Sequence, residues 1–348
     1  MRVGLVSPYD LGRPGGVQDQ VIRLAGWLSE AGHEPVIVGP GTEGPEDAIL
    51  LGGTTTITAN RAATPIRLDP RVGRSLATAL AGVDVIHVHE PLMPAVSPAA
   101  LRVSGPPKVA TFHADPPAWV RRLYRYGRSG VRMVLRRASV VTVTSPISGS
   151  SIDGIVDYRI IPNGIDVGSY AKGPKEPLSV AFLGRDDERK GLSVLLGAWP
   201  TVRESVPGAT LCVMGADRGE RNDGVEYLGW VGDETKRERL ASAAVFCAPN
   251  LGGESFGITL AEAMAAACAV VASTIPAFEH VAGPAARLVE PGDPGHLAEQ
   301  IIDLLANPDS ARDLGRAAAD RVQRFDGATV AAAFLEAYED AVAAQATL

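Results

Sequence analysis

The chain has 348 residues, of which 46% are hydrophobic and 21% charged, and its formal net charge is −7. This composition excludes a disordered chain, and the length predicts two globular domains that each have a core of their own. The acidic balance argues against a general nucleic-acid-binding protein.

The first half of the chain alternates apolar strands with helical segments. Residues 2–7 read as a short buried strand, and residues 17–31 show the apolar period of a helix. Further strands are expected at 35–38, 83–88, 108–112 and 140–144. Strands that alternate with helices imply a parallel sheet with helices on both faces.

The same pattern starts again after a linker at residues 173–177. Strands are expected at 178–183, 209–214, 245–248 and 270–272, with a helix over 192–202. The sequence therefore predicts an α/β protein with two doubly wound, Rossmann-like domains, at 1–171 and 172–327, that face each other across a cleft. An alanine-rich helix at 328–348 is expected to return to the first domain.

Ligands of such sheets bind beyond the carboxyl ends of the strands. Four sites of interest fall there: Gly15-Gly16, His113, Arg185 and Glu254. The glycine pair precedes a helix, so its amides could hold a phosphate, although many ordinary strand-to-helix turns use glycine. These positions predict a ligand site at the carboxyl edge.

Two further motifs carry charge. The loop Gly184–Gly191 contains Arg185, Arg189 and Lys190, which could neutralise a departing diphosphate or form local ion pairs in a solvated loop. Glu254 and Glu262 lie eight residues apart at an expected helix start, so both could face one hydroxyl-rich ligand. An ordinary helix with an N-terminal carboxylate is the simpler alternative. Together the motifs favour a sugar-nucleotide site.

Taken in order, Pro14–Val17, Gly184–Gly191 and Glu254–Glu262 resemble the motifs of the family 4 retaining glycosyltransferases, which have the GT-B architecture. The resemblance runs from Met1 to about Tyr338. Within that family the chain is most similar to the actinobacterial phosphatidyl-myo-inositol mannosyltransferases, through Ile86–Pro91 and Gly252–Gly257. It implies a mannosyltransferase that uses GDP-mannose and a lipid-linked or polyol acceptor such as phosphatidylinositol, with a role in phospholipid metabolism.

The resemblance also implies roles for single residues. Its catalytic set is His113, Arg185, Lys190 and Glu254. Its donor-binding set is Gly15, Gly16, Val231, Asp233, Lys236, Ser255, Phe256, Gly257, Ile258 and Glu262. Its acceptor-binding set is Tyr9, Gln18, Asn60 and Arg67. Glu262 would hold the ribose, and Val231, Asp233 and Lys236 would form the guanine side of the pocket.

The resemblance implies a reaction in which the acceptor attacks from the face that the nucleotide leaves. No Asp-x-Asp motif occurs in the chain. Arg185 and Lys190 are therefore expected to take the place of a metal ion, and no cofactor or metal is predicted. His87 and His89 share one strand face, yet the likeness and the lack of a third nearby ligand favour structural histidines.

The segment Arg121–Arg137 is rich in arginine, and no acidic residue occurs between Asp115 and Asp153. Read as one helix, it places its arginines on one face and Val120, Leu123 and Leu135 on the other. Such a segment could contact an anionic membrane, or it could be an ordinary solvated face of arginines over the domain core.

Other readings remain for the whole chain. They are a family 4 enzyme with a UDP-sugar donor and a soluble acceptor, a sugar-nucleotide epimerase, and a non-catalytic sugar-nucleotide-binding protein. No apolar run approaches the about 18 residues of a membrane span. The three cysteines lack C-x-x-C spacing and are expected to be buried and reduced. The expected location is cytoplasmic, with peripheral contact at the inner face of the plasma membrane, and no nucleic-acid partner.

Overall fold

The structure is a computed structural model that describes residues 1–59, 62–66, 72–170, 173–219 and 222–346. It divides into two compact units, which we call the N-terminal unit (1–164 with 327–348) and the C-terminal unit (165–326). The boundary expected from the sequence lies between residues 171 and 172, whereas the units change at Gly164/Ile165 and again at Asp326/Gly327. The C-terminal helix belongs to the N-terminal unit.

The described part of the N-terminal unit is built on a parallel sheet. Its strands are β1 (Arg2–Val6), β2 (Glu34–Gly39), β3 (Ile49–Leu50), β6 (Val85–His89), β7 (Lys108–Phe112), β8 (Val140–Val143) and β9 (Arg159–Ile160), in the order β3-β2-β1-β6-β7-β8-β9. Strands β4 (Thr55–Ala59) and β5 (Ala62–Ile66) form a separate antiparallel hairpin. All neighbouring strands of the main sheet are parallel.

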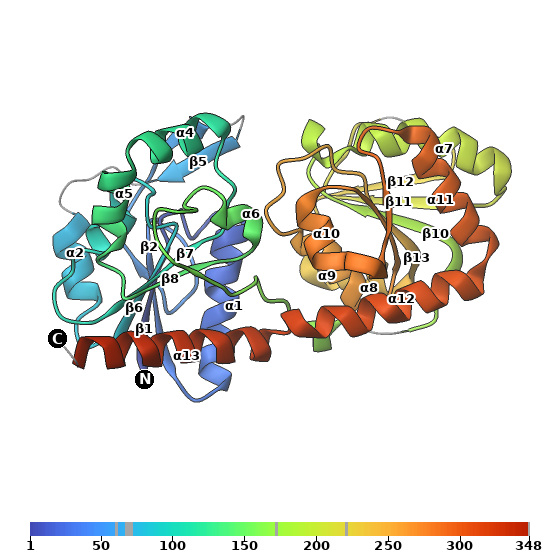
Figure 1. Cartoon of the computed structure of the whole chain (residues 1–348). Helices are drawn as coiled ribbons and strands as arrows, with labels where there is room; N and C mark the ends of the chain where they lie inside the picture. The colour runs from blue at the N-terminus through green and yellow to red at the C-terminus, as the bar shows by residue number, and fades with distance from the viewer. Residues whose placement is uncertain (60–61, 67–71, 171–172, 220–221, 347–348) are drawn as a thin grey trace. The chain divides into compact units, whose positions relative to one another are not determined.

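Helices cover both faces of this sheet (Figure 1). They are α1 (Gly16–Glu30), α2 (Val72–Ala79), α3 (Val96–Ala100), α4 (Ala118–Tyr126), α5 (Arg128–Leu135), α6 (Pro146–Gly149) and α13 (Gly327–Ala346). Apolar side chains of α1 and α13 share one core with strand residues such as Leu5 and Val109. Those of α2 and α3 pack on the other face against Val6 and Ile86.

The C-terminal unit repeats the plan with its own parallel sheet, in the order β12-β11-β10-β13-β14-β15. These strands are β10 (Glu176–Leu183), β11 (Thr210–Met214), β12 (Val225–Gly229), β13 (Ala243–Ala248), β14 (Ala269–Ser273) and β15 (Arg287–Val289). Its α-helices are α7 (Leu192–Ser205), α8 (Asp233–Ser242), α9 (Ile258–Ala265), α10 (Pro276–Ala282), α11 (Pro294–Ala306) and α12 (Pro308–Val322). Short 3₁₀ turns are η1 (Val167–Ser169), η2 (Glu188–Lys190), η3 (Gly283–Ala285) and η4 (Gln323–Phe325).

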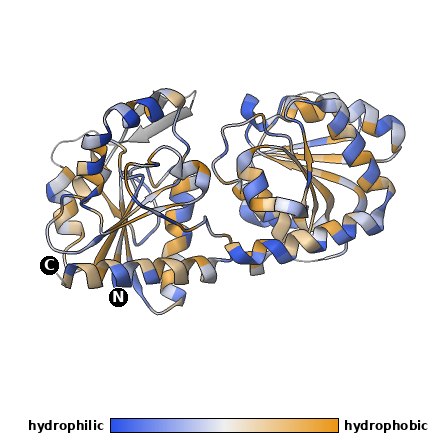
Figure 2. Cartoon of the chain, viewed as in Figure 1, coloured by the Kyte–Doolittle hydropathy of each residue, from blue (hydrophilic) through white to orange (hydrophobic). Residues whose placement is uncertain are grey.

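Side-chain alternation along the strands explains why both faces need a helical cover. On β13, Phe246 faces the core that contains α9 and α12, while Val245 and Cys247 face the core of α7 and α11. Figure 2 shows the resulting apolar strands between helices whose hydrophilic residues lie outward. In each sheet the chain builds outward on one side and then returns to the other, so β1/β6 and β10/β13 are the points where the strand order reverses.

The two-domain parallel-sheet fold is confirmed, and every strand expected from the sequence is present. Cys247 and Cys268 are buried, whereas Cys212 is only half-buried because β11 lies beside the edge strand β12; all three are free thiols. Within the described ranges, no helix has both the length and the hydropathy that crossing a bilayer requires.

One expectation is wrong. The arginine-rich segment is two helices, α4 and α5, and not a single one, because the first ends at Gly127. Glycine is a poor helix former, and each new helix starts its own series of faces. On α4, the Leu123 side chain is 59% exposed.

Candidate functional site

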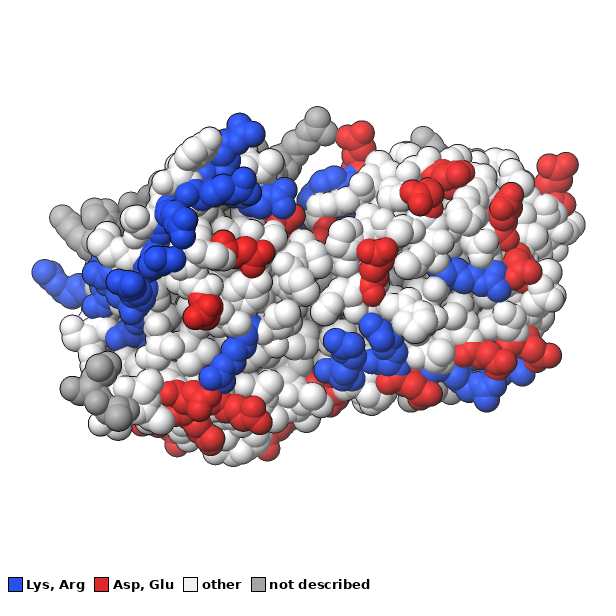
Figure 3. Space-filling model, in the orientation of Figure 1, with Lys and Arg blue, Asp and Glu red and all other residues white. Residues whose placement is uncertain are grey.

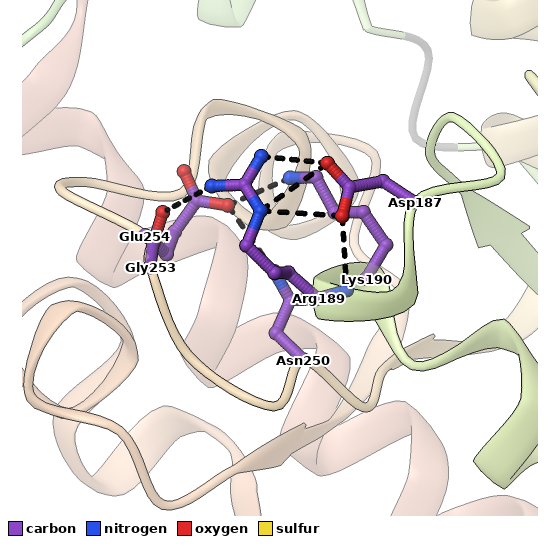
Figure 4. A network of polar contacts seen from close by, with 6 residues as sticks. All are labelled: Asp187, Arg189, Lys190, Asn250, Gly253 and Glu254. Carbon is purple, nitrogen blue, oxygen red and sulfur yellow. Dashed lines mark hydrogen bonds and ion pairs between the residues drawn. The ribbon is translucent and has the colours of Figure 1, made fainter. Parts of the chain in front are cut away.

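Two loops of the C-terminal unit meet where its strand order reverses. One loop follows β10 and ends with η2, and the other follows β13. Between them, Lys190 Nζ donates to Glu254 Oε2 over 2.7 Å, and Asn250 Nδ2 donates to the same oxygen over 3.1 Å. Figure 4 shows the Lys190 and Asn250 side chains converging on the Glu254 carboxylate. The lysine and glutamate side chains are 22% and 20% exposed, so a ligand can reach them.

Arg189 links the same two loops in a different way. Its guanidinium forms an ion pair with Asp187, with Nη2 2.6 Å from Oδ2, and Nη1 lies 3.4 Å from the Gly253 carbonyl oxygen (Figure 4). The hydrogen bond from Arg189 lowers the pKa of Asp187 to about 2. Leu251 N also donates to the Arg189 carbonyl over 2.8 Å. We call Asp187, Arg189, Lys190, Asn250, Gly253 and Glu254 the Lys190 cluster.

Three members of this cluster, Arg189, Lys190 and Glu254, were singled out from the sequence. The structure brings Lys190 and Glu254 into contact, whereas Arg189 forms a local ion pair with Asp187, which was the alternative for this loop. The sequence motifs gave no role to Asp187 or Asn250. The position of Asn250 directly after a buried strand was the available signal, because polar residues at strand ends meet at the carboxyl edge of a parallel sheet. Arg185 lies exposed in the same loop, where its carbonyl accepts from Asp187 N over 2.8 Å.

The residues around the start of α9 follow Glu254 directly in the chain. Gly257 precedes the helix with φ +96°, a backbone conformation that favours glycine. Phe256 points into the core, with its ring 5.1 Å from that of Phe325, so only its backbone is available to a ligand. Ser255 and Ile258 are half-buried beside it. The donor-binding role expected for Phe256 and Gly257 would therefore fall to their backbone amides.

A second pair of charges joins α8 to α9. Glu262 is 3% exposed, and its Oε1 lies 2.9 Å from Lys236 Nζ, which also contacts Asp233 Oδ1 over 2.8 Å. Burial alone lowers the pKa of Lys236, but the two carboxylates outweigh it, so this pKa is raised. Val231 lies partly buried against the adjoining core. The residues expected for the ribose and for the base therefore adjoin each other.

In the N-terminal unit, the glycine pair begins α1 as expected. Gly15 caps the helix in an extended conformation, and Gly16 is its first residue. The Gln18 side chain is buried and folds back, with Nε2 donating to the Asp10 carbonyl over 3.2 Å. Gln18 thus shapes this turn. Tyr9 lies half-buried after β1, while Asn60 and Arg67, also expected on the acceptor side, lie outside the described residues.

His113 ends β7 and belongs to a buried histidine cluster. Its Nε2 lies 2.8 Å from His89 Nδ1, and its Nδ1 lies 3.1 Å from Asn163 Oδ1. Burial lowers the pKa of His113 to about 4, so the imidazole is neutral at physiological pH. His87 contacts Tyr338 Oη of α13 over 2.8 Å. Across the described residues, no group of three or more His, Cys, Asp or Glu is arranged to hold a metal ion.

Glu90 is a further residue to which the sequence motifs gave no role. One of its carboxylate oxygens accepts from the backbone N–H groups of His113 and Ala114, over 2.7 and 2.8 Å. Burial raises the pKa of Glu90 to about 7, although these two hydrogen bonds act in the opposite direction. Glu90 itself has φ +47°, which is unusual for a residue with a side chain. It fixes the loop that carries His113.

The buried histidines give a prediction about pH. Burial lowers the pKa of His87, His89 and His113, so the folded protein keeps these histidines neutral. Below about pH 6.5 the unfolded chain binds protons at these histidines and the folded protein does not, so the free energy of unfolding falls as the pH falls. Glu90, with its raised pKa, has the opposite sign over the same window. Together, these four groups make the chain take up about two protons when it unfolds near pH 5.5. The free energy of unfolding should therefore change by about 2–3 kcal/mol per pH unit.

Calorimetric melting between about pH 7 and 5 should therefore show a steep loss of stability in the N-terminal unit. His87→Asn should reduce the slope by about one proton, while His296→Asn in the C-terminal unit is the matched control. A melting temperature that stays flat over this range would contradict the neutral state of the cluster.

Comparisons with known proteins relate both units to glycosyltransferases. Residues 14–169 match the family model described as Glycosyltransferase Family 4, and residues 177–307 match the model described as Glycosyl transferases group 1. A phosphatidyl-myo-inositol mannosyltransferase of Mycolicibacterium smegmatis is 36% identical over 374 residues, covering 97% of this chain and 94% of that protein. One from Mycobacterium leprae is 34% identical, covering 97% and 96%.

The fold is also similar to solved structures. A sucrose-phosphate synthase from Thermosynechococcus elongatus superposes with a TM-score of 0.73, covering 99% of both chains at 22% sequence identity. At that identity the likeness concerns the fold alone. Together with the two family models, it identifies the architecture as GT-B.

Proposed function

The chain belongs to the family 4 glycosyltransferases and is therefore a glycosyltransferase, and we propose that it transfers mannose from GDP-mannose to a phosphatidylinositol-type lipid or another polyol acceptor. The names of its relatives support the choice of sugar and acceptor. Identities of 34–36% over nearly the full length also make a shared reaction class the simplest expectation.

The contact between Lys190 and Glu254 carries the proposal. A cation and a carboxylate 2.7 Å apart, both reachable from solvent, offer complementary groups to the two halves of a sugar nucleotide. The ammonium suits the diphosphate, and the carboxylate suits the hydroxyls of the sugar. Lys236 of α8 and Glu262 of α9 supply the same complementarity for the nucleoside.

We propose a retaining reaction in which protein cations stabilise the leaving diphosphate. Lys190 and Arg185 lie in one loop after β10, so both can approach the same anion. Fixed positive charge at a developing anion is often the largest catalytic contribution. The acceptor hydroxyl would attack from the face that the diphosphate leaves, and that diphosphate would take the proton. No metal is needed for these steps.

The enzyme would act at a membrane surface, because that is where a water-soluble nucleotide sugar and a phospholipid meet. The expected place is the cytoplasmic side, with peripheral contact at the inner face of the plasma membrane.

Binding and transfer assays test the donor and the acceptor separately. GDP should stabilise the protein by about 2.7 kcal/mol at a concentration about 100 times its Kd, while UDP at the same concentration should have a smaller effect. Incubation of the enzyme with labelled GDP-mannose and phosphatidylinositol should then give a lipid heavier by one hexose in mass spectrometry. Preferential stabilisation by UDP, with no mannosylated lipid, would contradict the proposal and favour a UDP-sugar donor.

A further inference from the structure

Helices α4 and α5 carry a concentration of positive charge on an acidic protein. The segment has seven arginines and no acidic residue between Asp115 and Asp153, although the whole chain has a formal net charge of −7. The arginines are Arg121, Arg122, Arg125, Arg128, Arg132, Arg136 and Arg137. Figure 3 shows a band of Lys and Arg over this part of the N-terminal unit. The charge is therefore local, and it has the sign that attracts an anionic partner.

The same helices expose large apolar side chains. Trp119, Leu123 and Tyr126 are 63%, 59% and 83% exposed, and Met133 on α5 is 64% exposed. The first three are spaced i, i+4 and i+7, so they line one face of α4. Four of the nine exposed large hydrophobic side chains among the described residues thus fall within 15 consecutive residues. We call these four residues and the seven arginines the α4–α5 surface.

Part of this surface is fixed, and part is available to a partner. Arg132 Nε donates to the Ile155 carbonyl over 2.7 Å, and Arg121 pairs with Asp115 over 3.2 Å. These contacts hold the helices against the unit. By contrast, Arg122, Arg125 and Arg136 are exposed and form no ion pair with a described residue. Their guanidinium groups therefore remain available for anions.

We propose that the α4–α5 surface docks the enzyme on an anionic phospholipid bilayer. A bilayer interface offers, in one plane, phosphate groups for arginines and an apolar layer for Trp, Leu and Tyr side chains. On α4, Arg122 and Arg125 lie on one side of the exposed apolar face, so both interactions can form together. Each arginine near a charged leaflet strengthens binding by about fivefold. The inference rests on the proposed lipid acceptor, to which it adds the surface that brings the enzyme to it.

Flotation of the full chain with vesicles tests the docking directly. We expect it to float with phosphatidylcholine vesicles that contain about 30% phosphatidylinositol, to remain unbound with phosphatidylcholine alone, and to lose binding as salt rises. Arg122→Glu with Arg125→Glu should weaken binding at least about 25-fold. Trp119→Ser with Leu123→Ser should also weaken it, because the apolar contribution is lost.

The chain offers a matched control. Arg312 and Arg316 are exposed on helix α12 of the C-terminal unit, so Arg312→Glu with Arg316→Glu changes the net charge equally. That pair should leave flotation unchanged. Equal losses for both pairs, or flotation that does not depend on anionic lipid, would overturn the docking surface. So would wild-type binding to a short RNA with the same dependence on Arg122 and Arg125 but no binding to vesicles.

A transfer assay separates this inference from the proposed function. Arg122→Glu with Arg125→Glu should transfer mannose to acceptor lipid dispersed in detergent within about twofold of the wild type, yet lose most transfer to vesicles, because only docking is affected. Normal transfer to vesicles by this variant would refute the docking while leaving the function intact. No transfer by the wild type under any condition, with anionic flotation retained, would refute the function alone.

Discussion

Replacing Lys190 with alanine is expected to lower kcat/KM for sugar transfer by about 100- to 1000-fold. The change removes a cation from the loop where the departing diphosphate would lie. It also leaves Glu254 with Asn250 as its remaining side-chain partner among the described residues. Both losses act on groups that are proposed to contact the donor, so kcat should fall more than nucleotide affinity. Arg185→Ala should change kcat/KM in the same direction, because that side chain lies exposed in the same loop.

Steady-state kinetics with the labelled donor, together with nucleotide titrations, would measure the two parameters separately. Arg312→Ala is the control, because it removes an exposed cation of the same unit that pairs only with a neighbouring aspartate, Asp309, on α12. It should remain within about twofold of the wild type, as surface changes usually do. Near-normal turnover of Lys190→Ala, with its fold intact, would remove the proposed role for this lysine.

The largest loss of stability is expected from Gly191→Ala. Gly191 precedes α7 with φ +69°, and an added Cβ would lie 1.8 Å from the Pro249 carbonyl oxygen. An alanine there must adopt a left-handed backbone conformation and push apart the two loops of the Lys190 cluster. The free energy of unfolding should fall by about 3–5 kcal/mol, from backbone strain and overpacking together. For a unit of this size, that lowers the melting temperature by roughly 10 °C.

Gly197→Ala, within the helix that Gly191 precedes, is the matched control. Gly197 is exposed, and an added Cβ would meet only Pro294 Cβ, at an ordinary distance of 3.7 Å. Alanine should therefore stabilise α7 by about 0.5–1 kcal/mol. Differential scanning calorimetry of both variants would show opposite shifts. If Gly191→Ala melted like the wild type, the close approach of the two loops would be incorrect.

The sequence predicted the architecture well because the pattern that encodes it is local. Apolar runs that end in Gly or polar residues mark β1, β6, β7, β10 and β13, and each occurs where expected. The short edge strands β3 and β9 have two residues each, too few to show a period. The alternation of strands and helices then leaves few topologies, because parallel crossovers have one handedness.

The donor-side motifs were also readable, although the partners of their side chains were not. The sequence singled out Lys190 in one motif and the pair Glu254 and Glu262 in another. It did not show that Lys190 bonds to Glu254 or that Lys236 bonds to Glu262. Such pairings depend on which loops the sheet places side by side. The order of the strands in a sheet depends on how whole strands pack, and no single motif describes that.

By itself, the sequence determined two parallel-sheet units and membership of a glycosyltransferase family, and it singled out the loops that are proposed to bind a sugar nucleotide. The tertiary structure decided which charges meet, since Lys190 and Glu254 are 64 positions apart in the sequence. It also brought His87 to Tyr338 of α13, which is 251 positions away. It also exposed Leu123 beside the arginines of α4. The physical reason is that propensity and periodicity report on neighbours along the chain. Contacts between distant segments arise only when the cores close and fix which strand lies next to which.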